Sequence, residues 1–224
     1  MILMIPETIK VYLRPLYVPV ANLYYDMFRK PRRYRYLFES INLTHAAKIL
    51  EVGTWNGERA LQMIDTAHKA SPESNIAYYG FDLFEQMTDQ VFLDEVSKRP
   101  PSMADVRLKL EKSGAEIHLY PGNTKDTLPK EILTLPKMDF VFIDGGHHVD
   151  TISSDWNAVS KLMHATTIVI FDDYWRNRSD AGCKLLIDSL DRAVYNVEVL
   201  PIVDSFDNDE FGRLDISFAK VTLR

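Results

Sequence analysis

The sequence predicts an α/β protein: three layers, α/β/α, around a seven-stranded, mostly parallel sheet that ends in an antiparallel hairpin. From Lys48 onward, short apolar segments alternate with segments of helical spacing, which is typical of a parallel sheet with helices on its faces. Two apolar segments, ending at Ile143 and Phe171, stop abruptly on carboxylates, as buried parallel strands do. The last two apolar segments have no helical pattern between them, which predicts the hairpin.

Seven segments have the short apolar, β-branched and aromatic character of strands. They are residues 48–52, 76–81, 116–120, 140–143, 167–171, 196–200 and 215–223. Helical spacing predicts helices at 58–70, in two segments within 85–113, and at 125–135, 149–163 and 181–191. Pro100 and Pro101 separate the two helical segments, and Gly114 closes the second. The turn-rich residues 204–212 are expected to be a loop.

Length and composition favour one globular domain with an appendage. The 224 residues are 46% hydrophobic and 26% charged, which is ordinary for a globular protein. We expect an N-terminal helical arm at 1–47 and the main domain at 48–224. Neither a secretory leader nor a run of about 20 apolar residues is recognisable, so a cytoplasmic location is expected. The single cysteine, Cys183, excludes an internal disulfide.

Charge is distributed unevenly along the chain. Residues 1–38 contain seven Lys and Arg against two Asp and Glu, a net of +5, which leaves −11 for the remainder of a chain whose total is −6. The acidic main domain argues against a nucleic-acid binder, which needs a broad basic face. The basic, aromatic arm is expected to pack on the domain or on a second subunit, which favours a homo-oligomer; peripheral contact of residues 1–38 with a membrane remains an alternative.

Three carboxylates are expected to meet at one edge of the sheet. Asp144 follows the strand at 140–143, and Asp172 and Asp173 follow the strand at 167–171. If those strands are neighbours, the three acids converge, and Mg²⁺ or another divalent cation is the simplest means of balancing their charge. A structural role for Asp172, as a cap of the next segment, is the alternative. His147 is placed to act as a general base, with the adjacent His148 as the competing candidate.

A glycine turn follows the first strand, in the segment Glu51-Val-Gly-Thr-Trp-Asn-Gly57. Glycines allow the backbone to approach a ligand, and a helix N-terminus offers N–H donors. Asp82 ends the second strand, where an acid can accept the two hydroxyls of a ribose. A plain tight turn, with Asp82 as a helix N-cap, would explain the same residues without a ligand.

These motifs, taken together, resemble those of class I S-adenosylmethionine-dependent methyltransferases, which have a Rossmann-like fold. The resemblance is strongest to metal-dependent small-molecule O-methyltransferases, including the macrolide-sugar type, and it covers residues 48–224. The segments that carry it are Glu51–Gly57, Gly80-Phe-Asp82, Gly122-Asn-Thr124, Phe142-Ile-Asp-Gly-Gly-His147 and Phe171-Asp-Asp173. At the position of Asp173 the catechol-type enzymes usually have Asn, so the acidic pair favours the sugar or natural-product branch.

The resemblance implies a role for each matching residue. The residues that would hold the methionine part of S-adenosylmethionine are Glu51, Gly53, Thr54, Trp55, Asn56 and Gly57. Asp82 would hold the ribose, and Asn123 and Thr124 would lie against the adenine. Asp144, Asp172 and Asp173 would bind the metal, Asp144 would also be close to the cofactor, and Asp144 and His147 would be catalytic.

The implied function is transfer of a methyl group to a hydroxyl of a small molecule, such as a sugar or natural product, with a divalent metal and a histidine base. Two alternatives remain at this stage. One is a metal-dependent enzyme of the same scaffold that does not methylate, similar to a hydroxylase. The other is a non-catalytic cofactor-binding protein.

Overall fold

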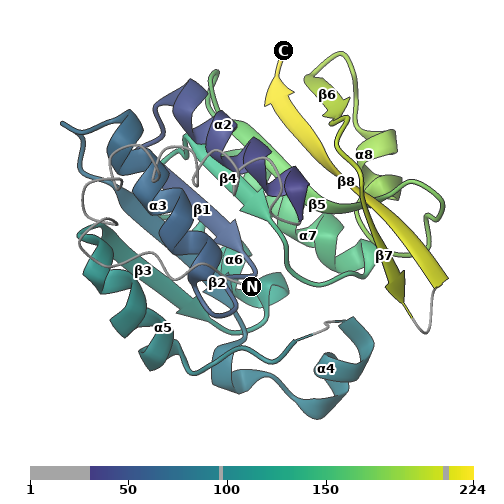
Figure 1. The fold of residues 1–224 in the computed structure, drawn as a ribbon, viewed down its shortest axis with the longest axis horizontal. Coiled ribbons are helices and arrows are strands. Elements are labelled where there is room, and N and C mark those ends of the chain that lie inside the picture. Colours follow the sequence, from purple (N-terminus) through teal and green to yellow (C-terminus); the bar gives the residue numbers. More distant parts are fainter. Residues whose placement is uncertain (1–30, 96–97, 209–211) are drawn as a thin grey trace, which may run out of the picture.

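A computed structural model describes residues 31–95, 98–208 and 212–224. Within these residues, eight strands form one sheet, in the order β3-β2-β1-β4-β5-β8-β6, and β7 also pairs with β8 (Figure 1). The first five strands of this order are parallel, whereas β8 runs antiparallel to β5, β6 and β7. The sheet therefore has a parallel body and an antiparallel end.

The strands have the following bounds: β1 Lys48–Val52, β2 Ala77–Asp82, β3 Glu116–Pro121, β4 Phe140–Ile143, β5 Ile168–Trp175, β6 Tyr195–Val199, β7 Asp204–Asn208 and β8 Gly212–Leu223. The α-helices are α2 Arg35–Thr44, α3 Glu58–Ala70, α4 Asp89–Glu95, α5 Met103–Leu110, α6 Thr124–Glu131, α7 Val149–Val159 and α8 Lys184–Ser189. Short 3₁₀ turns lie at η1 Arg32–Tyr34, η2 Phe84–Gln86, η3 Glu111–Ser113 and η4 Ser160–Leu162.

Helices cover both faces of the sheet, because alternate residues of each buried strand point to opposite sides. In β1, Leu50 and Val52 pack in one core cluster with residues of α6, α7 and α8. Ile49 points the other way and packs with residues of α2, α3 and α5. Figure 1 shows α2 and α3 in front of the sheet and α6 and α7 behind it. The predicted three-layer arrangement is thus confirmed.

The prediction missed one strand and misplaced several ends. Residues Asp204–Asn208, expected as loop, form β7, because their backbone pairs with β8 despite a polar, turn-like sequence. The fifth strand does not stop at Phe171 but continues as β5 to Trp175. The helix expected at 125–135 ends at Glu131, and the one expected at 181–191 is reduced to α8.

The segment that precedes β1 is packed into the domain. In α2, the side chains of Leu37 and Ile41 are fully buried in the core cluster that also contains α3. His45, in left-handed conformation, ends α2 and directs the chain into β1. Residues 1–30 of the predicted arm, with most of its basic and aromatic sequence, lie outside the described residues. Every helix in the described part of the chain is too short or too polar to span a bilayer.

Candidate active site

A cavity of about 280 Å³ lies where the parallel strands end. This is the edge at which open α/β sheets bind ligands. Residues from both halves of the sheet line it, together with two residues of the segment before α2. They are Arg33, Tyr34, Val52, Gly53, Trp55, Phe81, Asp82, Leu83, Met87, Val91, Lys98, Pro100, Asn123, Thr124, Asp144, Gly145, Gly146, His147, Thr151, Asp172 and Asp173.

Most of the site residues expected from the sequence are among them. The cavity brings together Gly53, Trp55, Asp82, Asn123 and Thr124 on the side expected for a nucleoside, and Asp144, His147, Asp172 and Asp173 on the side expected for catalysis. Four others do not line it: Glu51, Thr54, Asn56 and Gly57. Of the two competing histidines, His147 lines the cavity, whereas His148 directly precedes α7 as its N-terminal cap residue.

Asp82 is fixed at the cavity by backbone donors. Its Oδ2 accepts a hydrogen bond from the N–H of Trp55 at 2.6 Å, and its Oδ1 accepts one from the N–H of Phe84 at 3.1 Å. Burial raises the pKa of Asp82, although these backbone donors act in the opposite direction. Each oxygen has a second lone pair, so the carboxylate can still accept two hydroxyl donors from a ligand.

The turn after β1 approaches the end of β4 so closely that only glycine fits. Gly53 has φ +93°, and a Cβ placed on it would lie 1.9 Å from the carbonyl oxygen of Asp144. Because glycine lacks a Cβ, the two strand ends can meet. Gly53, on the side expected for a nucleoside, therefore lies directly against Asp144, on the side of the carboxylates.

Glu51 is buried beneath the cavity and does not reach it. Its carboxyl group accepts a short hydrogen bond from the hydroxyl of Tyr78, which also contacts the Thr54 hydroxyl at 3.2 Å. Burial raises the pKa of Glu51 to about 8, against the effect of the Tyr78 hydrogen bond. At neutral pH this side chain is accordingly mostly protonated.

A bulge in β5 turns two consecutive acids toward the same site. The pairing of β5 with β8 shifts register between Phe171 and Tyr174, and Asp173 adopts the left-handed conformation with φ +57°. In a regular strand Asp172 and Asp173 would point to opposite faces. The extra residue of a bulge re-aims a side chain, and Asp tolerates a positive φ better than most residues do. Both carboxylates therefore face the cavity.

Asp173 holds His147 in place. His147 Nε2 lies 3.1 Å from Asp173 Oδ2, and the indole N–H of Trp175 donates to Asp173 Oδ1 at 3.1 Å. Burial acts to raise the pKa of Asp173, but its contact with His147, together with Arg33 and Trp175, outweighs burial, so the pKa is lowered and the carboxylate stays ionised. An ionised Asp173 fixes the orientation of the imidazole and would stabilise its cationic form.

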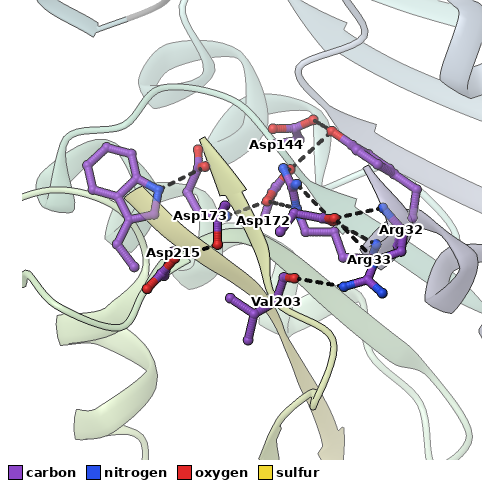
Figure 2. A network of polar contacts seen from close by, with 11 residues as sticks. Arg32, Arg33, Asp144, Asp172, Asp173, Val203 and Asp215 are labelled. Atoms are coloured by element: carbon purple, nitrogen blue, oxygen red, sulfur yellow. Dashed lines mark hydrogen bonds and ion pairs between the residues drawn. The ribbon is translucent and has the colours of Figure 1, made fainter. Parts of the chain in front are cut away.

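Arg33 and Tyr34 enter the carboxylate cluster from η1 (Figure 2). The Arg33 guanidinium donates to both oxygens of Asp172, from Nε at 2.8 Å and from Nη2 at 2.9 Å. The Tyr34 hydroxyl donates to Asp172 Oδ2 at 3.1 Å and lies 3.5 Å from Asp144 Oδ2. Burial, reinforced by the charges of Asp172 and Asp173, raises the pKa of Asp144 well above its usual range, and Arg33 opposes this.

The three carboxylates do not fit the divalent metal that the sequence predicts. A carboxylate offers about four lone-pair positions. All those of Asp172 face protein donors, and each oxygen of Asp173 faces one partner. Among the described residues, no group of three or more His, Cys, Asp or Glu side chains is arranged to hold a metal ion. Arg33 and Tyr34, which take part instead, were not among the residues expected from the sequence.

Comparison with known proteins identifies the family of the chain and relatives of its fold. Residues 50–174 match the family described as a methyltransferase domain. An O-methyltransferase from Bacillus cereus, solved with S-adenosylhomocysteine, superposes with a TM-score of 0.59 over 99% of this chain and 93% of its own, at 17% identity. The Streptomyces achromogenes O-methyltransferase TomG, involved in tomaymycin synthesis and solved with S-adenosylmethionine, gives 0.57 over 96% of each chain, at 16% identity.

No curated protein matches the chain significantly. The two solved structures share the fold but too little sequence to indicate more than the fold. The match to the family covers more than half of the chain, including the glycine turn, Asp82, Asp144, His147 and both acids of the bulge. The chain therefore belongs to the methyltransferase-domain family.

Proposed function

We propose that this protein is an S-adenosylmethionine-dependent methyltransferase that moves a methyl group to a hydroxyl of a small molecule, with His147 as the base. The observation that carries the proposal is the cavity, in which Asp82 and the glycine turn stand opposite His147 and the carboxylates. Membership of the methyltransferase family supports the reaction type. The bound cofactors of the two structural relatives support the choice of methyl donor.

The cavity's chemistry fits this cofactor. Asp82 has acceptor capacity for ribose hydroxyls, and the glycine turn allows the backbone to approach a ligand there. Bound S-adenosylmethionine would supply an activated methyl group on a positively charged sulfonium. Asn123 and Thr124, at the start of α6, line the same side and are proposed to contact the adenine.

On the opposite side, His147 would take the proton of the acceptor hydroxyl as its oxygen forms the bond to the methyl carbon. The cofactor, held by Asp82 and the glycine turn, would supply the methyl group and would keep the electron pair of the former carbon–sulfur bond on its sulfur. Asp173 stabilises the resulting imidazolium, which it contacts at 3.1 Å. The metal predicted from the sequence has no step in this scheme, because the lone-pair positions of Asp172 already face protein donors.

Calorimetric titration of S-adenosylhomocysteine tests the proposal. Wild-type protein should bind one equivalent, and Asp82→Asn should bind about 10- to 100-fold more weakly, since it loses a charged acceptor for the ribose. Asp65→Asn is the matched control, because Asp65 lies on α3, is mostly exposed and pairs with Lys69 outside the cavity. A folded wild-type protein that fails to bind S-adenosylhomocysteine would contradict the proposal.

A further inference from the structure

Donors from the protein itself occupy the hydrogen-bond acceptor positions of the Asp172 carboxylate. Its Oδ1 accepts from Arg33 Nε at 2.8 Å and from the backbone N–H of Asp173 at 2.6 Å. Its Oδ2 accepts from Arg33 Nη2 at 2.9 Å and from the Tyr34 hydroxyl at 3.1 Å. Four donors fill the roughly four lone-pair positions that a carboxylate has. A metal ion would have to displace at least one of them.

Arg33 is buried at this position and is held there by several contacts. Its side chain is only 6% exposed, and Nη1 lies 3.4 Å from Oδ2 of Asp204, the first residue of β7. The same Asp204 carboxylate accepts hydrogen bonds from the backbone N–H groups of Arg32 and Arg33, at 3.0 and 2.9 Å. The rings of Phe218 and Phe206 make cation–π contacts with Arg33, with ring centres 5.4 and 5.6 Å from the guanidinium carbon. Two carboxylates and these rings hold the cation in one place.

A guanidinium remains protonated at any pH the protein experiences. Bidentate contact with a carboxylate is also among the strongest polar contacts available to a protein. Arg33 therefore places a permanent positive charge next to the Asp172 carboxylate. Figure 2 shows Arg33 reaching Asp172 beside Asp144, where the sequence predicted a shared metal.

We propose that Arg33 replaces the divalent cation at this site, so that methyl transfer proceeds without a metal and the acceptor needs no second oxygen for chelation. This rests on the proposed function. A guanidinium already engaged by two carboxylates cannot be chelated by a vicinal diol or catechol, as a metal ion can. The acceptor class accordingly extends to small molecules with a single hydroxyl, positioned by the cavity wall and by His147.

The test is Mn²⁺ binding to the chelator-treated full chain, followed by electron paramagnetic resonance, with S-adenosylhomocysteine affinity measured with and without EDTA. We expect no saturable Mn²⁺ site that depends on Asp172, and the same cofactor affinity in both buffers. One Mn²⁺ per chain, lost in Asp172→Asn, would overturn the proposal while leaving the methyltransferase proposal intact. Failure of S-adenosylhomocysteine to bind in either buffer would instead reject the underlying function.

Arg33→Met, which removes the charge at similar length, provides a second readout. Its uncompensated carboxylates should attract a divalent ion, so millimolar Mn²⁺ should raise its melting temperature by several degrees and leave wild type unmoved. Arg32→Met is the matched control, because Arg32 is half-exposed and its guanidinium contacts the Val203 carbonyl and, at 3.9 Å, Asp204, but not Asp172. A folded Arg33→Met that ignores Mn²⁺ would overturn the substitution of arginine for metal. If Arg33→Met does not fold, the wild-type measurement decides.

Discussion

His147 and His148 are neighbours in sequence with different surroundings. His147 lines the cavity and contacts Asp173, whereas His148 precedes α7 as its N-terminal cap residue. The two residues therefore form a natural pair of test and control. A base must lie within reach of the proton it takes, and of these two histidines only His147 lines the cavity.

His147→Gln should lower kcat by about 10²- to 10⁴-fold, the usual contribution of a positioned base. Its affinity for S-adenosylhomocysteine should stay near that of wild type, because the cofactor contacts lie on the other side of the cavity. The rate is measured as S-adenosylhomocysteine release with an acceptor found by screening hydroxylated small molecules. His148→Gln should keep near-wild-type kcat, and an equal loss in both variants would remove the basis for choosing His147.

Glu51 gives the protein a pH-dependent stability with a definite sign. Its folded pKa is about 8, whereas the ordinary value is 4.5. Between these values the folded state retains a proton that the unfolded state has lost, so stability falls as pH rises. The stabilisation that the retained proton provides is fully present below about pH 4.5 and is lost above about pH 8.

Glu51→Gln removes this titration and keeps an oxygen for Tyr78 to donate to. Relative to the variant, wild type should lose about 3–4 kcal/mol of unfolding free energy between pH 5 and pH 8, because the loss is about 1.4 kcal/mol per pH unit and smaller near each pKa. Urea denaturation of both proteins at pH 5, 6.5 and 8 measures the difference. Parallel stability curves would mean that Glu51 titrates normally in the folded protein.

At the scale of elements, the bulge of β5 depends on the loop that follows it. Gly182 has φ +74°, and a Cβ there would lie 2.3 Å from the carbonyl oxygen of Asp173. The N–H of Gly182 donates to the His147 carbonyl at 2.8 Å, and that of Cys183 donates to the Asp173 carbonyl at 3.0 Å. These hydrogen bonds thus connect the backbones of His147 and Asp173 to each other through this loop.

Gly182→Ala should destabilise the protein by about 2–3 kcal/mol more than Gly114→Ala. Gly114 also has a positive φ, +78°, but a Cβ there would meet nothing within 4 Å. Both variants bear the cost of a left-handed alanine, about 1–2 kcal/mol, whereas Gly182→Ala adds the contact with Asp173. Chemical denaturation of the two variants separates these effects. Equal losses would show that the loop yields without disturbing the bulge.

Local sequence determined some elements and left others open. The strands β1 and β4 and helix α3 were predicted with their observed bounds, because their apolar periodicity begins and stops abruptly. The bulge was not predicted, since nothing in Phe171-Asp-Asp-Tyr174 reports the register with β8. For the same reason β7 was read as loop: its polar residues form a strand only through pairing with a distant segment.

The candidate site, like the fold, was predicted only in part. Asp144, Asp172 and Asp173 were expected to converge because each follows the apolar part of a parallel strand, and they do line one cavity, together with Asp82 and His147. Arg33 lies 139 positions before Asp172, and no spacing rule connects the two. The signal available was charge: paired acids without a basic neighbour in sequence, in a chain whose excess positive charge lies in residues 1–38.

At the scale of the whole molecule, residues 31–47 contribute to both the core and the site, although the family match begins at residue 50. Leu37 and Ile41 are fully buried, each worth about 1.5–3 kcal/mol. Arg33 balances the buried Asp172, and removing one partner of such a pair costs about 3–5 kcal/mol. The predicted boundary at residue 48 would remove all three residues together.

A chain that begins at residue 48 should therefore fail to fold cooperatively, because these losses approach the 5–15 kcal/mol that stabilises an ordinary domain. The matched comparison is a chain that begins at residue 31, which differs from it only in η1, α2 and their flanking residues. Circular dichroism melting of the two proteins provides the measurement, and the longer chain should melt in a single transition at a clearly higher temperature. Equal melting temperatures would mean that residues 48–224 form a domain by themselves, with the segment that carries Arg33 as a dispensable attachment.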